Sequence, residues 1–184
     1  MTGMRYDTLA RQVAGDIARS VAAVDPDAVG DLVDRLARRK KVVLIGTGRS
    51  GAVLRAMAVR LGHLGVDARC VGPDDAPRIA GGEFVLVGSG SGRTAVPLRQ
   101  AEAARAAGAE IVAITADPAS PIAELAGLVI HIPAPAAPAD GTPHTLRSLF
   151  EECLLVVCDC VCKLLADKLG VSTEEMQRRH APDR

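Results

Sequence analysis

Short apolar segments alternate with segments of helical spacing through the middle of this chain. Five short segments predict strands, at residues 42–45, 67–71, 84–88, 110–114 and 128–132. The stretches between them carry apolar residues at helical spacing and predict helices near residues 49–64, 94–107 and 120–126. Uninterrupted apolar runs are typical of parallel strands that are covered on both faces. We therefore predict a doubly wound α/β fold, with a five-stranded parallel sheet in the flavodoxin-like order 2-1-3-4-5 flanked by helices.

The remaining segments also favour helices, and the whole chain, residues 1–184, is expected to form a single domain. Its expected parts are N-terminal helices at 4–40, the α/β core at 41–132, a proline-rich linker at 133–143 and C-terminal helices at 144–180. The last long helix, near residues 145–168, is almost entirely apolar after Phe150. A helix that is apolar on most sides must be buried. We therefore expect a second copy of the chain to cover this helix and predict a homo-oligomer.

The composition excludes several classes of partner. Lys plus Arg and Asp plus Glu both number 22, so no net charge attracts the chain to nucleic acid or to acidic membranes. With no Trp, one Tyr and two Phe, the chain lacks the aromatic platforms on which bases stack. The first residues lack the apolar core of a signal peptide, and no apolar run reaches membrane-spanning length. We expect a cytoplasmic protein that binds neither nucleic acid nor membranes.

Four of the five cysteines lie close together in one apolar segment, at Cys153, Cys158, Cys160 and Cys162. Their spacing is not C-x-x-C, and no suitably spaced histidine accompanies them. Free cysteine is among the residues most often buried. We therefore predict thiols buried in the core or at a subunit interface, and no metal site.

Two turns rich in glycine and serine carry the clearest functional signal. The first, Gly46–Gly51, follows the strand at 42–45, and the second, Gly88–Thr94, follows the strand at 84–88. Each leads into a helix, whose first backbone N–H groups and dipole stabilise an anion such as phosphate. In the predicted order the two strands are neighbours, so both turns meet at the topological switch point and predict one phosphorylated ligand held from two sides. The candidate contacts to this ligand are Gly48, Arg49, Ser50, Ser89, Ser91, Arg93 and Thr94.

A dinucleotide is an alternative ligand for the first turn. Gly46, Gly48 and Gly51 match the pattern G-x-G-x-x-G after a strand. However, the strand at 67–71 lacks the acidic residue at its end that would bind the ribose. The phosphate loop G-x-x-x-x-G-K-[ST] does not occur in the sequence either. The sequence therefore does not favour a nucleotide.

Several motifs together resemble those of the sugar isomerase (SIS) domain. They are Gly46–Gly51, Arg60–Gly65, Gly88–Gly92 and Ala113–Thr115. Leu149–Glu151 and the ending Glu175–Ala181 extend the likeness over almost the whole chain and make it similar, more narrowly, to the 6-phospho-3-hexuloisomerases. The resemblance implies interconversion of D-arabino-3-hexulose 6-phosphate and fructose 6-phosphate, the second step of formaldehyde fixation through ribulose monophosphate. It also implies no metal or organic cofactor, and a tetramer or dimer with active sites near subunit contacts.

The implied reaction needs few catalytic groups. A carboxylate removes a proton from the carbon beside the ketone, a cis-enediol forms, and the proton returns to the neighbouring carbon. Glu151 matches the Phe-Glu position of the family and is the candidate base, with Glu152 beside it as the alternative. His180, in the matching ending, is the second catalytic candidate. It would open the sugar ring or move hydroxyl protons, in its own subunit or in a neighbour's.

The chain departs from the hexuloisomerase pattern at two places. Arg93 stands where that family usually has Glu, and Arg147 with Ser148 stands where it usually has Gly followed by Thr or Ser. Two added cations are compatible with phosphate binding but leave the identity of the sugar open. The alternatives are an SIS isomerase for a different phosphosugar and a non-catalytic SIS module that binds one.

Overall fold

The computed structural model describes residues 5–72, 79–134 and 143–180, without the side chain of Arg147. Residue 4 and most of the predicted linker at 133–143 lie outside these ranges. The strands are β1 (Lys41–Ile45), β2 (Asp67–Val71), β3 (Phe84–Gly88), β4 (Glu110–Thr115) and β5 (Leu128–His131). The helices are α1 (Tyr6–Ala22), α2 (Pro26–Ala37), α3 (Gly48–His63), α4 (Ala95–Ala106), α5 (Pro121–Leu125), α6 (Ser148–Leu169) and α7 (Thr173–His180).

The strands form one parallel sheet in the order β2-β1-β3-β4-β5, which confirms the predicted fold class and topology. Each predicted strand agrees with the observed one to within one residue at either end. The predicted helix near 145–168 begins differently. Residues Thr145–Arg147 form a 3-10 turn in which Leu146 has a φ of 51°, so the α-helix starts only at Ser148.

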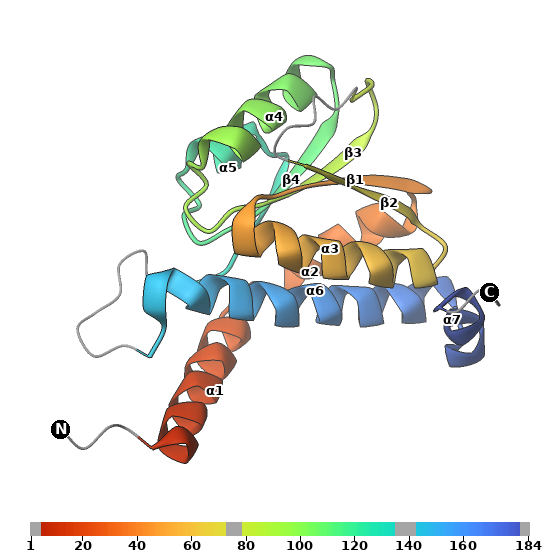
Figure 1. Cartoon of the computed structure of the whole chain (residues 1–184). Coiled ribbons are helices and arrows are strands. Elements are labelled where there is room, and N and C mark those ends of the chain that lie inside the picture. The colour runs from red at the N-terminus through yellow and green to blue at the C-terminus, as the bar shows by residue number, and fades with distance from the viewer. Residues whose placement is uncertain (1–4, 73–78, 135–142, 181–184) are drawn as a thin grey trace.

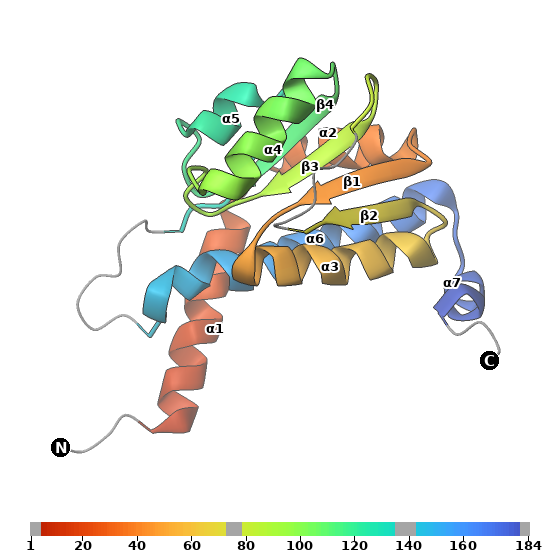
Figure 2. The same cartoon turned by 45° about the horizontal axis from the view of Figure 1, so that its top comes forward.

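Helices cover both faces of the sheet (Figures 1 and 2). α4 and α5 pack on one face, and α2, α3 and α6 pack on the other. Successive side chains of a strand point to opposite faces. Leu44 of β1 and Leu86 of β3 therefore lie in the core with α6, whereas Val43 and Val85 lie in the core with α4. This double burial explains why the strands read as continuous apolar runs.

α6 runs along the length of the molecule (Figure 1). It starts at the end where the strands finish, and α7 lies at its opposite end. α1 contacts α6 and extends away from the body of the molecule in both views. Among the described residues, none of the helices combines the length and the apolar character that crossing a membrane requires.

The cysteines of α6 divide between its two faces. Cys153, Cys158 and Cys162 are buried, whereas Cys160 is exposed. Burial raises the pKa of Cys153 and of Cys162 to about 11, so both are protonated and unreactive at neutral pH. The prediction of buried thiols is confirmed for these three, and for the exposed Cys160 the alternative of a subunit interface stays a prediction. Cys160 shares the exposed side of α6 with Leu155, Val156 and Leu164.

Candidate active site

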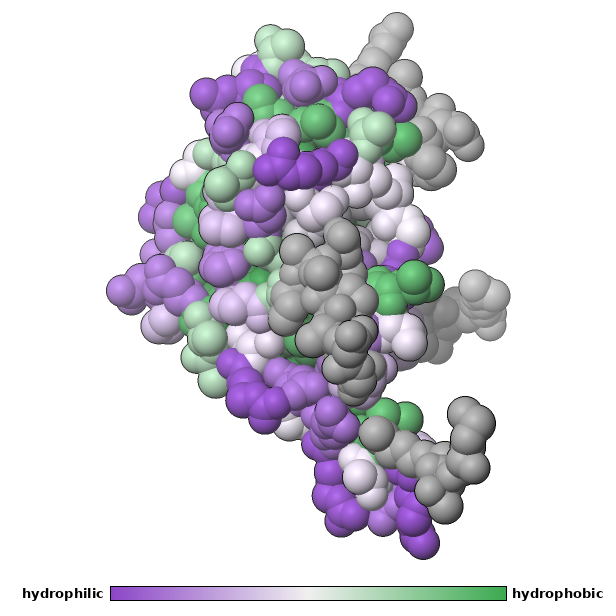
Figure 3. All heavy atoms as spheres, turned by 90° about the vertical axis from the view of Figure 1, so that its left-hand side faces the viewer, coloured by the Kyte–Doolittle hydropathy of each residue, from purple (hydrophilic) through white to green (hydrophobic). Residues whose placement is uncertain are grey.

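A cavity of about 380 Å³ opens at the carboxyl ends of the strands. Because Ile45 of β1 pairs with Val87 of β3, the two glycine-serine turns start side by side and form its floor. The start of α6 closes another side. Figure 3 views the molecule from this end, where hydrophilic and pale side chains take up most of the surface. Six of the predicted ligand contacts line the cavity: Arg49, Ser50, Ser89, Ser91, Arg93 and Thr94.

Two helices begin at the cavity without a side-chain cap. The N-cap residues Thr47 of α3 and Thr94 of α4 make no side-chain cap hydrogen bond. By contrast, Asp25 caps α2 and Ser120 caps α5 with their own side chains. Uncapped first turns present unpaired backbone N–H groups and the positive end of the helix dipole. Both helix starts therefore favour an anion in the cavity.

Hydroxyl groups cluster at the start of α4. The Oγ atoms of Ser89 and Ser91 lie 3.4 Å and 3.5 Å from Oγ1 of Thr94. The backbone N–H of Arg93 donates to Oγ of Ser91 at 3.3 Å. A hydroxyl both donates and accepts, so these side chains can turn their protons toward the oxygens of a phosphate. This is the part of the cavity best suited to a phosphate group.

Glu151 lies in the first turn of α6 and points into the cavity. Its Oε1 accepts a hydrogen bond from Oγ of Ser50 at 3.1 Å, and its Oε2 lies 3.1 Å from Nη2 of Arg49. The same Arg49 nitrogen donates to the carbonyl oxygen of Leu146 at 2.6 Å. The Glu151 side chain is 17% exposed. These contacts hold the carboxyl group in one orientation, as a base in a cavity requires.

Glu152 faces away from the cavity. Its Oε2 lies 2.8 Å from Nδ1 of the buried His144, on the side of α6 that contacts α1. Consecutive residues of a helix point about 100° apart, so only one of the two glutamates can face a ligand. The geometry therefore favours Glu151 over Glu152 as the base.

Arg93 is paired at the edge of the cavity. Its Nη2 donates to Oδ2 of Asp117 at 3.1 Å and approaches the carbonyl oxygen of Ala119 at 3.4 Å. The sequence analysis did not single out Asp117. It follows β4 at the same sheet edge as the two serine turns, and this position is the signal that would have identified it. The side chain of Arg147, the other departure from the family pattern, lies outside the described part of the structure.

Gly48 and His180 do not line this cavity. Gly48 begins α3 with a φ of 56°, a backbone conformation that glycine adopts without strain. His180 lies on α7, where its Nδ1 is 3.0 Å from Nε2 of His63. Burial, His180 and Arg60 lower the pKa of His63. Since α7 and the start of α6 are at opposite ends of the molecule (Figure 1), His180 lies apart from the cavity of its own chain.

Within the described ranges, no group of three or more His, Cys, Asp or Glu side chains is arranged to hold a metal ion. Besides apolar residues such as Leu146 and Phe150, the cavity is lined by residues that carry hydroxyls, by two arginines and by two carboxylates. This set suits acid-base chemistry on a phosphorylated ligand.

Comparison with known proteins identifies the family of this chain. The SIS domain family matches residues 35–149. The 3-hexulose-6-phosphate isomerase of Mycobacterium gastri is 42% identical over 173 residues, which make up 92% of this chain and 86% of the relative. The 3-hexulose-6-phosphate isomerase of Bacillus subtilis (strain 168) is 31% identical over 182 residues, or 97% of this chain and 98% of the relative.

A solved structure shares the whole architecture. It is the hypothetical protein MJ1247 from Methanococcus jannaschii. A molecular function of 3-hexulose-6-phosphate isomerase was inferred for that protein from its crystal structure. The two chains superpose with a TM-score of 0.80 at 28% identity, covering 94% of this chain and 97% of that one. The family match spans the strands and both serine turns, and it confirms the resemblance seen in the motifs. The chain belongs to the SIS domain family.

Proposed function

We propose that this chain is a phosphosugar isomerase that interconverts D-arabino-3-hexulose 6-phosphate and fructose 6-phosphate. The main support is the placement of Glu151, held by Arg49 and Ser50, in the same cavity as the uncapped start of α4. One end of the cavity thus suits a phosphate, and the other holds a base. Relatives that are up to 42% identical to this chain over the aligned residues carry the matching name.

In the proposed reaction, Glu151 moves one proton between two carbons. Its carboxylate takes the proton from C2 of the hexulose, the C2–H electron pair forms the C2=C3 bond, and the C3 oxygen gains a proton. The result is a cis-enediol. Glu151 then returns its proton to C3 while the C2 hydroxyl loses its own, which leaves the ketone at C2. The chemistry is redox-neutral within the substrate and calls for no metal or organic cofactor.

The pairing of Arg93 bears on the choice of sugar. An unpaired arginine at the edge of the cavity would favour a substrate with a second anionic group. Here Asp117 and the carbonyl oxygen of Ala119 both accept from Nη2 of Arg93, and the Asp117 carboxylate pairs with the guanidinium charge. The charge that departs from the family pattern is therefore offset within the chain. This favours the singly phosphorylated hexulose over a phosphosugar with an extra acidic group.

The test is a coupled assay of the purified chain. Enzymatically generated 3-hexulose 6-phosphate is supplied, and fructose 6-phosphate is followed through NADPH formation. We expect turnover of about 1–10³ s⁻¹, the usual range for enzymes. No turnover, with the fold intact and thermal stability raised by phosphosugars, would instead support the alternative of a different phosphosugar or a binding module.

We further propose that copies of this chain associate through the exposed face of α6. Leu155, Val156 and Leu164 on this face are 44%, 38% and 47% exposed. Exposed apolar patches mark association surfaces, and on this face the apolar side chains lie among charged ones that include the Lys163–Asp167 ion pair. His180 lies on α7, apart from the cavity of its own chain. Association would place it near the cavity of another copy.

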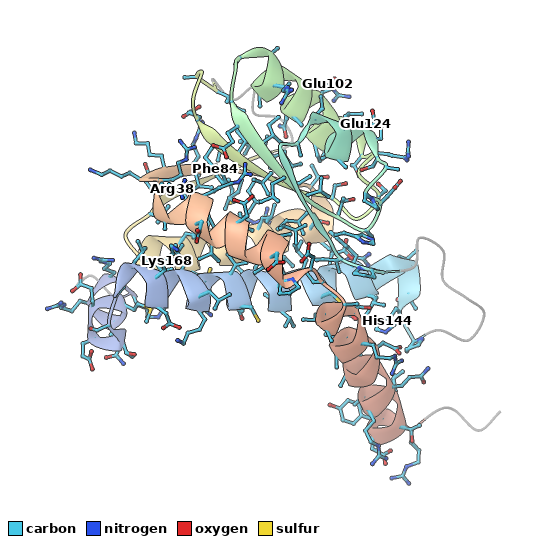
Figure 4. The ribbon with its side chains drawn as sticks, turned by 180° about the vertical axis from the view of Figure 1, so that it is seen from behind. Arg38, Phe84, Glu102, Glu124, His144 and Lys168 are labelled. Carbon is cyan, nitrogen blue, oxygen red and sulfur yellow. The ribbon has the colours of Figure 1, made fainter. Side chains whose placement is uncertain are left out.

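Replacing Leu164 by Glu is expected to lower the molar mass of the assembly, because it puts a charge into the proposed apolar contact. Light scattering should give a multiple of the 19.1 kDa chain for the unchanged protein and a smaller multiple for Leu164→Glu. Glu102→Lys, on the helix α4 that covers the opposite face of the sheet (Figure 4), is the control and should leave the mass unchanged. A wild-type mass of 19.1 kDa would refute the proposed contact.

A further inference from the structure

A buried histidine joins two helices beside the cavity. Nε2 of His144 lies 3.0 Å from Oδ2 of Asp16 on α1, and its Nδ1 lies 2.8 Å from Oε2 of Glu152 on α6. Only 5% of its side chain is exposed. In Figure 4, His144 lies where α1 meets the start of α6. Each ring nitrogen of His144 therefore has a carboxylate oxygen within 3.0 Å. Asp16, His144 and Glu152 thus form a triad of side chains that links α1 to α6.

The triad anchors the turn that forms one wall of the cavity. Leu146 follows His144 by two residues and adopts φ 51° and ψ 35°, the left-handed conformation that disfavours L side chains. Its side chain is 80% exposed, so packing does not hold it there. A strained backbone persists only where its surroundings impose it. Two constraints hold the turn: the buried His144, with a carboxylate oxygen near each ring nitrogen, and the hydrogen bond from Arg49 to the carbonyl oxygen of Leu146.

The strained turn is connected to the proposed base. The carbonyl oxygen of Leu146 accepts from Nη2 of Arg49 at 2.6 Å, and the same nitrogen lies 3.1 Å from Oε2 of Glu151. The position of this carbonyl therefore helps to decide where the guanidinium lies and how Glu151 is oriented. Small displacements of a catalytic group have large kinetic effects, of about 10²-fold for 1 Å.

We propose that His144 is a positioning residue. Held between Asp16 and Glu152, it fixes the turn at Leu146 and, through Arg49, the orientation of Glu151. The role rests on the proposed function, in which Glu151 is the base. His144 itself touches no reacting atom.

The kinetic test is a double-mutant cycle on the full chain. His144→Gln is expected to lower kcat about 10- to 100-fold, with a much smaller change in KM. Arg49→Lys keeps the charge but loses the planar fork. If His144 acts through Arg49, His144→Gln should cost little further activity in the Arg49→Lys background. If His144 only stabilised the fold, His144→Gln would lower kcat by the same factor in both backgrounds.

The matched control is the ion pair at the other end of α6. Nζ of Lys168 donates to Oδ1 of Asp34 at 2.6 Å and joins α6 to α2 (Lys168 is labelled in Figure 4). Asp34→Asn removes that pair and is expected to leave kcat unchanged. If His144→Gln does not fold, Asp16→Asn and Glu152→Gln each weaken the triad from one side and take its place in the cycle.

A structural measurement separates this inference from the proposed function. In crystal structures we expect the left-handed Leu146 and its contact with Arg49 in the unchanged protein, and the loss of both in His144→Gln. This result holds whether or not the hexulose is turned over. Absent turnover in the unchanged protein refutes the proposed function alone. An unaltered Leu146 turn in His144→Gln, or additive kinetic losses, overturns the positioning role.

Discussion

Glu151→Gln is expected to lower kcat for the interconversion of the two ketose phosphates by about 10³-fold, within the usual range for loss of an acid-base group. The amide keeps the size of the side chain and can still accept the hydrogen bond from Ser50. It cannot take up a proton from carbon at neutral pH. The change leaves the proposed phosphate contacts at Ser89, Ser91 and Thr94 in place, so fructose 6-phosphate should bind with nearly unchanged affinity. Steady-state kinetics and calorimetric titration measure the two effects separately.

Isotope exchange gives a second measurement of the same change. In D₂O the unchanged protein should place deuterium from solvent on C3 of fructose 6-phosphate, because the carboxyl proton exchanges with water between its two transfers. Glu151→Gln should place almost none. Both results follow from a single base that serves both carbons.

The neighbouring glutamate is the matched control. Glu152 is one residue along the same helix and pairs with His144 instead of lining the cavity. Glu152→Gln should therefore reduce kcat only through the position of the Leu146 turn, by no more than about 100-fold. If Glu152→Gln proved the more damaging change and Glu151→Gln retained turnover, the base would have to be reassigned to Glu152.

The sheet and the meeting of the two serine turns at one cavity could be predicted because both depend on short stretches of sequence. An apolar run such as residues 84–88 indicates a strand covered on both faces, and the glycines and serines after it indicate a turn into a helix. The order β2-β1-β3-β4-β5 then places two such turns together. Each step uses residues close in sequence and a general rule of parallel sheets.

The contacts that orient the base could not be predicted in this way. Asp16 and His144 are separated by 128 positions, and Arg49 reaches a backbone carbonyl 97 positions away. Neither contact produces a local sequence pattern. A backbone carbonyl acceptor also cannot be inferred from the residue type, because every residue has one. The left-handed conformation of Leu146 could not be predicted either, because Leu has no preference for that conformation. The contacts of His144 and the backbone conformation of Leu146 are therefore known only from the three-dimensional structure.

Gly51→Ala is expected to destabilise the fold by about 2–3 kcal/mol, the upper part of the usual cost of overpacking. A Cβ at Gly51 would lie 2.5 Å from the carbonyl oxygen of Gly46 and 2.9 Å from its carbonyl carbon. These are backbone atoms, where β1 passes into α3 beside the cavity, and they cannot rotate away as a side chain would. For a chain of this size the loss corresponds to a fall in Tm of roughly 5–10 °C. The displaced turn carries Arg49 and Ser50, so isomerase activity should fall as well.

Gly62→Ala tests whether this cost arises from the close approach and not from the loss of a glycine. Gly62 lies in the same helix, and a Cβ there would meet nothing within 4 Å. Since alanine is favoured over glycine in a helix by about 0.8–1 kcal/mol, Gly62→Ala should raise Tm by about 2 °C and leave activity unchanged. Thermal unfolding of the two variants side by side decides the matter. Equal changes in Tm at both positions would mean that α3 can move away from β1. The close approach of Gly46 to Gly51 would then not be what holds Arg49 and Ser50 in place.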